Sequence, residues 1–170
     1  PLPAALRDEA AQFLFWWIGG AWRLESALAL QDRGLAVFGY NWPNIAPKSF
    51  IEKCWKGVFQ DPRLAQSIYR QSRICLNSLS PGNESGPNMS YFNIPASGCM
   101  LLTNEGPQFP EYYDRSCEIA VFSDPESLAK AADVLLRNPQ DTREKARQSN
   151  LRTAREHLFE LRVDEILRRR

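Results

Sequence analysis

Apolar residues recur along this chain in two alternating patterns, one helical and one made of short buried runs. Spacings of three and four from Leu6 to Ala21 place apolar side chains on one helix face. Gly19-Gly20 is expected to weaken or kink this helix, and a second helical stretch follows over Trp22–Gln31. Residues 1–33 are therefore predicted to form an N-terminal helical segment.

Five short apolar runs bounded by turn-forming residues predict strands. They cover Leu35–Phe38, Trp55–Phe59, Ile74–Asn77, Cys99–Thr103 and Glu118–Phe122. Helices are expected over 63–71 and 89–97, then from residues 124 and 141, and a C-terminal helix over 159–170. Short apolar strands that alternate with amphipathic helices favour βαβ units. The predicted fold class is α/β, with a Rossmann-like parallel sheet flanked by helices.

Length and composition narrow this picture. A chain of 170 residues is predicted to form a single Rossmann-like domain over 1–170. The hydrophobic share of 44% and the charged share of 24% are typical of a soluble globular protein, and no apolar run is long enough to cross a membrane. A net charge of +1 argues against a nucleic-acid platform.

The cysteines and the histidine limit the available chemistry. Cys54, Cys75, Cys99 and Cys117 include no CxxC pair, which argues against zinc and thioredoxin-like sites. Reduced thiols and the lack of a signal-peptide pattern predict a cytoplasmic location. His157 is the only histidine, so a Cys/His nucleophile pair depends on that one base, and a structural role is favoured.

The stretch from Leu76 to Gly98 carries the candidate chemistry. In open α/β sheets, ligands bind beyond the carboxyl ends of strands, which directs attention to the loop Ser78–Pro87 and the helix that follows. Free N–H groups at a helix start favour an anion, and Ser90 and Asn93 offer hydrogen bonds to a sugar. A loop rich in Gly, Asn and Ser is also a common plain connection, so both interpretations stay open.

Several segments together resemble a known family. They are Tyr69–Asn77, Asn88–Gly98, Cys99–Thr103, Glu118–Phe122 and Glu156-His157 with Arg162, preceded by Gly34–Gly39 and Trp42. In this order and spacing they look like the C-terminal half of CgeB-like glycosyltransferases, which belong to the GT-B class. The similarity extends from about Arg23 to Leu167.

The resemblance implies the donor-binding half of a GT-B enzyme, with a nucleotide sugar as donor and neither a metal nor another cofactor. The implied donor-binding residues are Gly39, Asn77, Gly86, Asn88, Ser90, Asn93 and Glu118. The acceptor domain is expected N-terminal to this one, in cis or on a partner chain. Because the base of such enzymes usually comes from that other domain, no catalytic residue is named. The isolated domain is not expected to be active.

Two departures from the family pattern leave other functions open. Relatives commonly carry an arginine at the position of Ser90, which would bind the diphosphate. They carry an aspartate or glutamate at the position of Asn93, which would bind the ribose hydroxyls. A catalytically degenerate interaction or regulatory module is therefore the alternative, and an unrelated flavodoxin-like binding domain is a third. Lys56, Arg70 or Arg73 are candidates to replace the missing positive charge.

Aromatic residues are interpreted mainly as packing groups. Trp16, Trp17 and Trp22 either pack against the domain or a neighbour, or form an exposed surface for a partner or for sugar stacking, and packing is favoured. Tyr112 and Tyr113 admit ligand stacking, but loop packing is at least as well supported. His157 and Arg162 match a family segment at the start of the final helix, which implies capping and docking of that helix.

Overall fold

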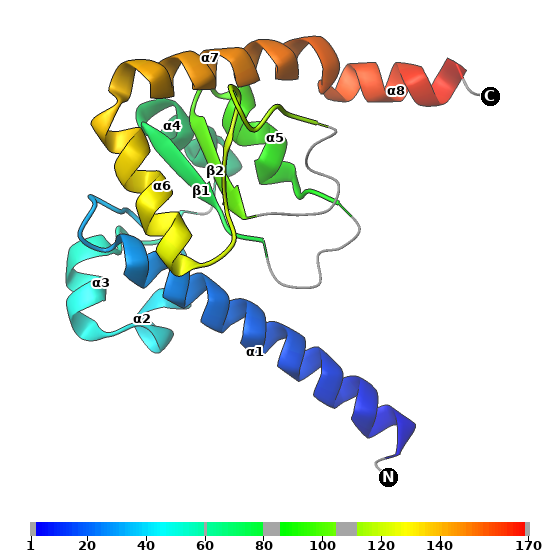
Figure 1. The fold of residues 1–170 in the computed structure, drawn as a ribbon. Coiled ribbons are helices and arrows are strands. Elements are labelled where there is room, and N and C mark those ends of the chain that lie inside the picture. Colours follow the sequence, from blue (N-terminus) through cyan, green and yellow to red (C-terminus); the bar gives the residue numbers. More distant parts are fainter. Residues whose placement is uncertain (1–2, 60, 80–85, 105–111, 169–170) are drawn as a thin grey trace.

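The structure, a computed structural model, describes residues 3–59, 61–79, 86–104 and 112–168. Its elements follow the chain (Figure 1) as α1 (Ala4–Leu30), α2 (Trp42–Ile45), α3 (Lys48–Cys54), α4 (Pro62–Gln71), β1 (Ile74–Asn77), α5 (Met89–Ala96), β2 (Met100–Asn104), β3 (Ala120–Phe122), α6 (Pro125–Arg137), α7 (Pro139–Glu156) and α8 (Phe159–Arg168). The strands form a parallel sheet in the order β1-β2-β3. The predicted α/β class with a parallel sheet flanked by helices is confirmed.

The central strand β2 separates two hydrophobic cores. Its side chains alternate, so that Met100 and Leu102 contribute to one core and Leu101 to the other. The first core is completed by residues of α1, α6 and α7, and the second by α5 and the segment before β3. A sheet covered on both faces explains why β1 and β2 are continuous apolar runs in the sequence.

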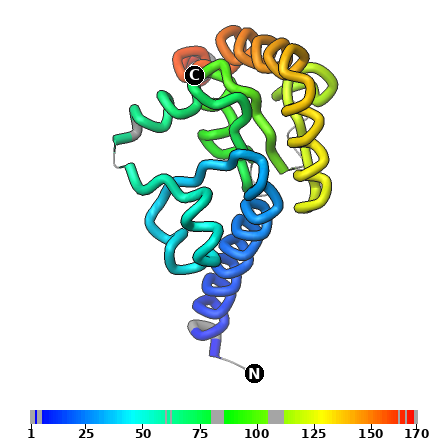
Figure 2. The backbone as a smooth tube through the Cα atoms, turned by 90° about the vertical axis from the view of Figure 1, so that its left-hand side faces the viewer, coloured from blue at the N-terminus to red at the C-terminus, as the bar shows by residue number. Residues whose placement is uncertain are grey.

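The two predicted strands before β1 are reduced to a single parallel bridge between Val37 and Trp55. Val37 N–H donates to Cys54 O at 2.9 Å, and Lys56 N–H donates to Val37 O at 2.9 Å. This segment has its own small core with α3, in which Phe50 is fully buried, and Figure 2 shows α2 and α3 beside the C-terminal half of α1. The prediction of two full strands is wrong, because the segment is anchored to α3 and not to β1.

Helix α1 continues without interruption through Gly19-Gly20, so the prediction of two separate helical stretches is wrong. Each glycine disfavours a helix by about 1 kcal/mol relative to alanine. Packing on one side offsets this cost, since Ala27 and Leu30 are buried and the Trp22 ring stacks on that of Phe122 with 6.2 Å between centroids. Tertiary contacts of the C-terminal half thus hold the whole helix together.

The N-terminal half of α1 projects from the body of the molecule (Figures 1 and 2). Trp16 and Trp17 are 66% and 64% exposed, so they do not pack against this domain, and their packing against a neighbour stays a prediction. In the described residues, none of the helices combines the length and the apolar character that crossing a membrane requires.

Helix starts follow the predicted caps. Asp61 Oδ1 accepts from Arg63 N at 2.9 Å at the start of α4, and Asp124 forms a capping box with Ser127 at the start of α6. Helix α7 begins at Pro139, two residues earlier than predicted. Its predicted apolar side, with Leu151, Ala154 and Leu158, is exposed, whereas small residues face the protein: Thr142, Ala146, Ser149 and Thr153. Small side chains let this helix approach the sheet closely.

Candidate functional site

Three polar side chains form a network at the carboxyl edge of the sheet. Asn77 ends β1, and its register partner in β2 is Thr103. Thr103 Oγ1 donates to Asn77 O at 3.1 Å, and Asn88 Nδ2 donates to Asn77 Oδ1 at 3.1 Å. Asn77 is 5% exposed and Thr103 is fully buried. The network therefore ties the start of α5 to the ends of β1 and β2.

Asn88 also caps helix α5. Its Oδ1 accepts from Tyr91 N–H at 3.1 Å, which satisfies one of the unpaired donors of the first turn. The N–H groups of Met89 and Ser90 have no acceptor within the helix at this position, and the helix dipole adds partial positive charge. The helix start consequently offers donors for an anionic or strongly polar ligand.

Asn104 joins β2 to the loop after β1. Its Oδ1 accepts from Leu79 N–H at 2.7 Å, and its Nδ2 donates to Leu79 O at 3.1 Å. Ser78 directly follows β1, and its buried hydroxyl makes no hydrogen bond to another described residue. The remainder of the predicted loop, residues 80–85, lies outside the described residues.

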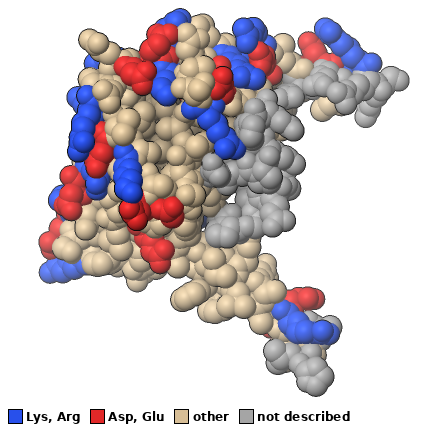
Figure 3. Space-filling model, viewed as in Figure 1, with Lys and Arg blue, Asp and Glu red and all other residues tan. Residues whose placement is uncertain are grey.

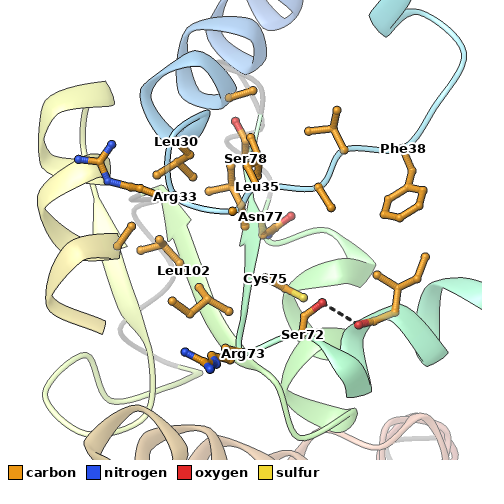
Figure 4. A pocket seen from close by; sticks show the side chains of 18 of the residues that line it. Leu30, Arg33, Leu35, Phe38, Ser72, Arg73, Cys75, Asn77, Ser78 and Leu102 are labelled. Atoms are coloured by element: carbon orange, nitrogen blue, oxygen red, sulfur yellow. Dashed lines mark hydrogen bonds between the residues drawn. The ribbon is translucent and has the colours of Figure 1, made fainter. Parts of the chain in front are cut away.

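A cavity of about 760 Å³ opens beside this network (Figure 4). One wall is β1, and the opposite wall is the segment Gly34–Phe38 with Trp42. Asn77 and Ser78 line the cavity at the carboxyl end of β1, together with Asn88, which is bonded to Asn77, while Ser72 and Arg73 line the end where β1 begins. Most of the remaining lining is apolar, including Leu30, Leu35 and Leu102. A mostly apolar cavity with a few convergent polar groups is the usual form of a ligand site.

Gly39 and Gly86 shape the backbone at this edge. Gly39 has φ +131°, and a Cβ on it would lie 3.6 Å from the Trp42 ring. Its carbonyl accepts from Trp55 Nε1 at 2.9 Å, which fixes the loop that carries Trp42. Gly86 has φ +133° and lies two residues before Asn88. Neither glycine lines the cavity itself.

Ser90 and Asn93 lie on the first turns of α5, three residues apart and so on one helix face. Ser90 is half-buried and Asn93 is exposed. Both are close in sequence to the Asn88 cap, but neither is among the residues that line the cavity. The structure thus groups Asn77 and Asn88 directly at the cavity, with Ser90 and Asn93 further along the helix.

Glu118 is not brought to this edge. It precedes β3, so in a parallel sheet it lies toward the amino ends of the strands, away from Asn77. Its Oε2 accepts from Arg152 Nη1 at 3.0 Å and from Asp114 N–H at 2.6 Å. With Glu118 only 8% exposed, these contacts hold α7 against the segment before β3. The structure separates this residue from the other predicted site residues.

The candidate cations differ in their positions. Of Lys56, Arg70 and Arg73, only Arg73 lines the cavity, and it does so just before β1, at the end away from the start of α5. Lys56 Nζ donates to Lys53 O at 2.9 Å. Arg33, also in the lining, makes a two-bond ion pair with Asp133 at 2.7 and 3.0 Å, which raises the pKa of Arg33 and lowers that of Asp133.

His157 and the tyrosines pack together near the end of α7. A ring nitrogen of His157 lies 3.0 Å from Tyr112 O, and the His157 ring contacts those of Phe92, Tyr112 and Tyr113. His157 ends α7 and anchors it to the Tyr112 segment. Loop packing is therefore the role seen for both tyrosines. Within the described ranges, no three His, Cys, Asp or Glu side chains come close enough together to hold a metal ion.

Sequence reasoning did not single out Thr103, Asn104 or Trp42 as site residues. A signal for the first two exists, because polar residues end the apolar runs of both β1 and β2. Neighbouring parallel strands end at the same edge of a sheet, so polar residues at both ends are expected to lie close together and to form hydrogen bonds. Trp42 belongs to the segments that resemble the family, but only the fold brings its loop opposite β1.

This fold is that of GT-B glycosyltransferase C-terminal domains. The C-terminal domain of a group 1 glycosyl transferase, LpcC from Francisella tularensis, matches with a TM-score of 0.62 at 12% identity, over 84% of this chain and 81% of that one. Sucrose-phosphate synthase from Thermosynechococcus elongatus matches with 0.65 at 13%, over 88% of this chain and 42% of that one. Anabaena HepE, in complex with UDP, matches with 0.63 at 11%, over 90% and 46%. The chain spans less than half the length of the latter two.

The sequence profile of the glycosyl transferase-like family matches residues 21–168. The chain therefore belongs to this family, and the resemblance inferred from its segments is confirmed at the level of glycosyl transferase-like proteins. None of the curated protein sequences compared with the chain matches it.

Proposed function

We propose that this chain is the donor-binding half of a GT-B glycosyltransferase of CgeB-like type, which binds a nucleoside diphosphate sugar for transfer of the sugar to an acceptor. The observation that carries the proposal is the Asn77–Asn88–Thr103 network, which sets the start of α5 beside the 760 Å³ cavity. Family membership and the UDP complex of a structural neighbour support it.

The proposed donor site uses hydrogen bonds more than charge. The N–H groups at the start of α5 would bind the diphosphate, and Ser90 and Asn93 the sugar or ribose hydroxyls. Gly39 and Gly86 would allow the two loops to approach the ligand. Glu118 stays outside this proposed set because it lies at the other edge of the sheet and pairs with Arg152.

Calorimetric titration of the 170-residue chain with UDP, GDP and TDP sugars tests the proposal. We expect one member of the panel to bind, and its binding to raise the melting temperature. Absence of both heat and a thermal shift across the whole panel would contradict donor binding. The Gln140→Arg variant, changed at an exposed position of α7, controls for nonspecific attraction of the phosphates.

A second candidate function is a module that keeps the fold without donor chemistry. The positions of two arginines in the cavity lining favour it, because Arg33 is paired with Asp133 and Arg73 lies at the end away from the start of α5. The double variant Ser90→Arg with Asn93→Asp restores the family's charged pair. If this function holds, the variant gains nucleotide binding that the unmodified chain lacks. Equal binding by both proteins would exclude it.

The exposed part of α1 is a candidate surface for binding the other half of the enzyme. Apolar side chains are exposed at six consecutive positions, Phe13–Ile18. At about 100° per residue they surround the helix, and Figure 3 shows this part of α1 almost free of charged side chains. We propose that the acceptor-binding domain, in cis or on a partner chain, covers it.

This partner proposal has a test in solution. In sedimentation velocity, we expect the isolated chain to self-associate through α1. The double variant Trp16→Gln with Trp17→Gln should be monomeric at an unchanged melting temperature. A monomeric unmodified chain that binds no apolar dye would contradict the proposal.

A cytoplasmic location and independence from metals and other cofactors complete the proposed function. The four cysteines are all free thiols, which is typical of proteins in reducing compartments. Activity of the complete enzyme in the presence of a chelator would test the metal independence.

A further inference from the structure

Two of the four cysteines touch each other inside the fold. Cys75 is the second residue of β1, and Cys99 immediately precedes β2. Cys99 Sγ donates a hydrogen bond to Cys75 Sγ across 3.2 Å. A disulfide has a sulfur–sulfur bond of about 2.05 Å, so the two atoms need to approach by only about 1 Å to bond.

The two thiols differ in access. Cys75 lines the 760 Å³ cavity, and its side chain lies there beside Ser72 in Figure 4. Cys99 is only 1% exposed and is not among the residues that line the cavity. A small solute that enters the cavity therefore meets the Cys75 sulfur first, with the Cys99 sulfur in position to react second.

We propose that Cys75 and Cys99 form a redox-active dithiol, which a hydroperoxide entering the cavity oxidises reversibly to an intramolecular disulfide. Cys75 is the attacking thiol and Cys99 the resolving thiol. Transient disulfides of this kind in reducing compartments are usually redox-sensing or catalytic.

The hydrogen bond divides these roles. It lowers the pKa of the Cys75 thiol, while the same bond and burial raise the pKa of Cys99. The thiolate is the nucleophile, so Cys75 is favoured as the first sulfur to react.

The chemistry proceeds in two balanced steps. The Cys75 thiolate attacks the terminal oxygen of the hydroperoxide, the O–O bond breaks, and the released alkoxide or hydroxide takes a proton to leave as alcohol or water. The Cys99 sulfur then attacks the sulfenic sulfur of Cys75. The S–S bond forms, the S–O bond breaks, and the Cys99 proton leaves with the hydroxyl as water.

The backbone around Cys99 permits the remaining approach. In the sheet register Cys75 pairs with Leu101, so Cys99 is displaced by two residues and must move toward β1. Gly98 precedes it with φ +77° and open space at its Cβ position, and Cys99 N–H makes only a long 3.4 Å bond to Ile94 O. A disulfide formed with such movement is strained and therefore easily reduced.

The other two cysteines determine how the experiment is designed, because one must be removed and the other serves as an internal control. Cys117 is exposed and would form intermolecular disulfides, so the test uses the 170-residue chain with Cys117→Ser. Cys54 is fully buried, and burial raises the pKa of its thiol, so it should stay reduced. Oxidation of Cys54 in the same sample would report general opening of the fold.

The test exposes this protein to hydrogen peroxide, stops the reaction with catalase, and alkylates the denatured chain for peptide mass spectrometry. We expect a Cys75–Cys99 linked peptide, lighter by two hydrogen atoms, that dithiothreitol restores. In Cys99→Ala the expected product is a dimedone-trapped sulfenic acid at Cys75, formed several-fold more slowly. Circular dichroism confirms that both proteins are folded.

Three outcomes would overturn the proposal: no linked peptide although Cys75 is oxidised, linkage through Cys54, or equal oxidation rates with and without Cys99. The readout needs no nucleotide. A failure here is therefore distinct from a failure of donor binding.

Discussion

The two edges of the parallel sheet carry polar clusters of opposite character. At the carboxyl edge, Asn77, Asn88 and Thr103 are neutral, and two of them line a cavity. At the amino edge, Glu118 and Arg152 form an ion pair with side-chain exposures of 11% and 25%. The first cluster presents polar groups to an open volume, whereas the second is closed by its own contacts.

Neighbouring contacts complete the amino edge. Tyr113 is fully buried, and its hydroxyl lies 2.6 Å from Thr153 Oγ1. Arg152 also pairs with Glu156 at 3.0 Å. A charged group whose partners are all supplied by the protein has little capacity left for a ligand. Charge alone therefore does not mark a ligand site, and polar groups that face a cavity are a better indication of one.

The largest expected effect comes from removing the Tyr113 ring. Tyr113→Ala deletes a buried aromatic side chain and should lower the free energy of unfolding by about 4 kcal/mol, measured by urea denaturation. Tyr113→Phe keeps the ring and loses only the Thr153 bond, which should cost about 1 kcal/mol. Weaker binding of a nucleotide by Tyr113→Phe would show that the amino edge takes part in ligand binding.

Glu118→Gln should have the next largest effect. It removes one charge of a mostly buried pair and leaves Arg152 with Glu156, so we expect a loss of about 2 kcal/mol in unfolding free energy. Calorimetric affinity for the nucleotide should not change. A tenfold weaker affinity for the nucleotide without a loss of stability would indicate that Glu118 takes part in donor binding.

The caps of α5 and α6 form a matched pair. Asn88→Ala and Asp124→Ala should each cost about 1 kcal/mol of stability, because each removes a side chain that caps a helix N-terminus. Only Asn88→Ala also breaks the link to Asn77 at the cavity. We expect it alone to weaken nucleotide binding about tenfold, a loss of about 1.4 kcal/mol. Equal affinities of the two variants would place the ligand elsewhere.

The pH dependence of the free energy of unfolding is the smallest expected effect, because it is absent near neutral pH. Burial raises the pKa of Tyr113 from its ordinary 10 to about 12, so the folded chain keeps the phenol protonated where the unfolded chain ionises. This contribution is complete below pH 10 and is lost as the pH rises toward 12. Urea denaturation from pH 7 to pH 11 should show a decline above pH 10 that Tyr113→Phe reduces. The same slope in both proteins would assign the decline to other groups.

Local signals in the sequence predicted much of the fold. Asp61-Pro62 and Asp124-Pro125 marked the starts of α4 and α6, because a cap and a first-turn proline act within a few residues. The apolar run at Ile74–Asn77 became β1 because both faces of a parallel strand are buried. Such features need no knowledge of distant residues.

The wrong predictions involve distant contacts. Gly19-Gly20 did not break α1, because the core around Leu30 and Phe122 stabilises the helix. Leu35–Phe38 did not form a full strand, since its contact with the segment after α3 is an isolated parallel bridge between Val37 and Trp55. A strand requires a partner, and the run itself does not specify which one.

The candidate site divides in the same way. Asn77 and Asn88 were expected near a ligand from their order after a strand and before a helix, and their roles in donor binding stay predictions. Thr103 and Trp42 lie at the candidate site because of the register of β2 and the loop fixed by Gly39. Glu118 left it because β3 runs parallel to β1, which places its N-terminal flank at the opposite edge.

Periodicity, caps and chain order were enough to establish the class of fold and the segment Leu76–Gly98 as its chemically interesting part, since these depend on interactions within a few residues. The assembly of three-dimensional neighbours decided the rest: the neutral network at the cavity, the closed ion pair of Glu118, and the contact between Cys75 and Cys99. Cys75 and Cys99, for example, are 24 residues apart and meet only after β1 and β2 have paired.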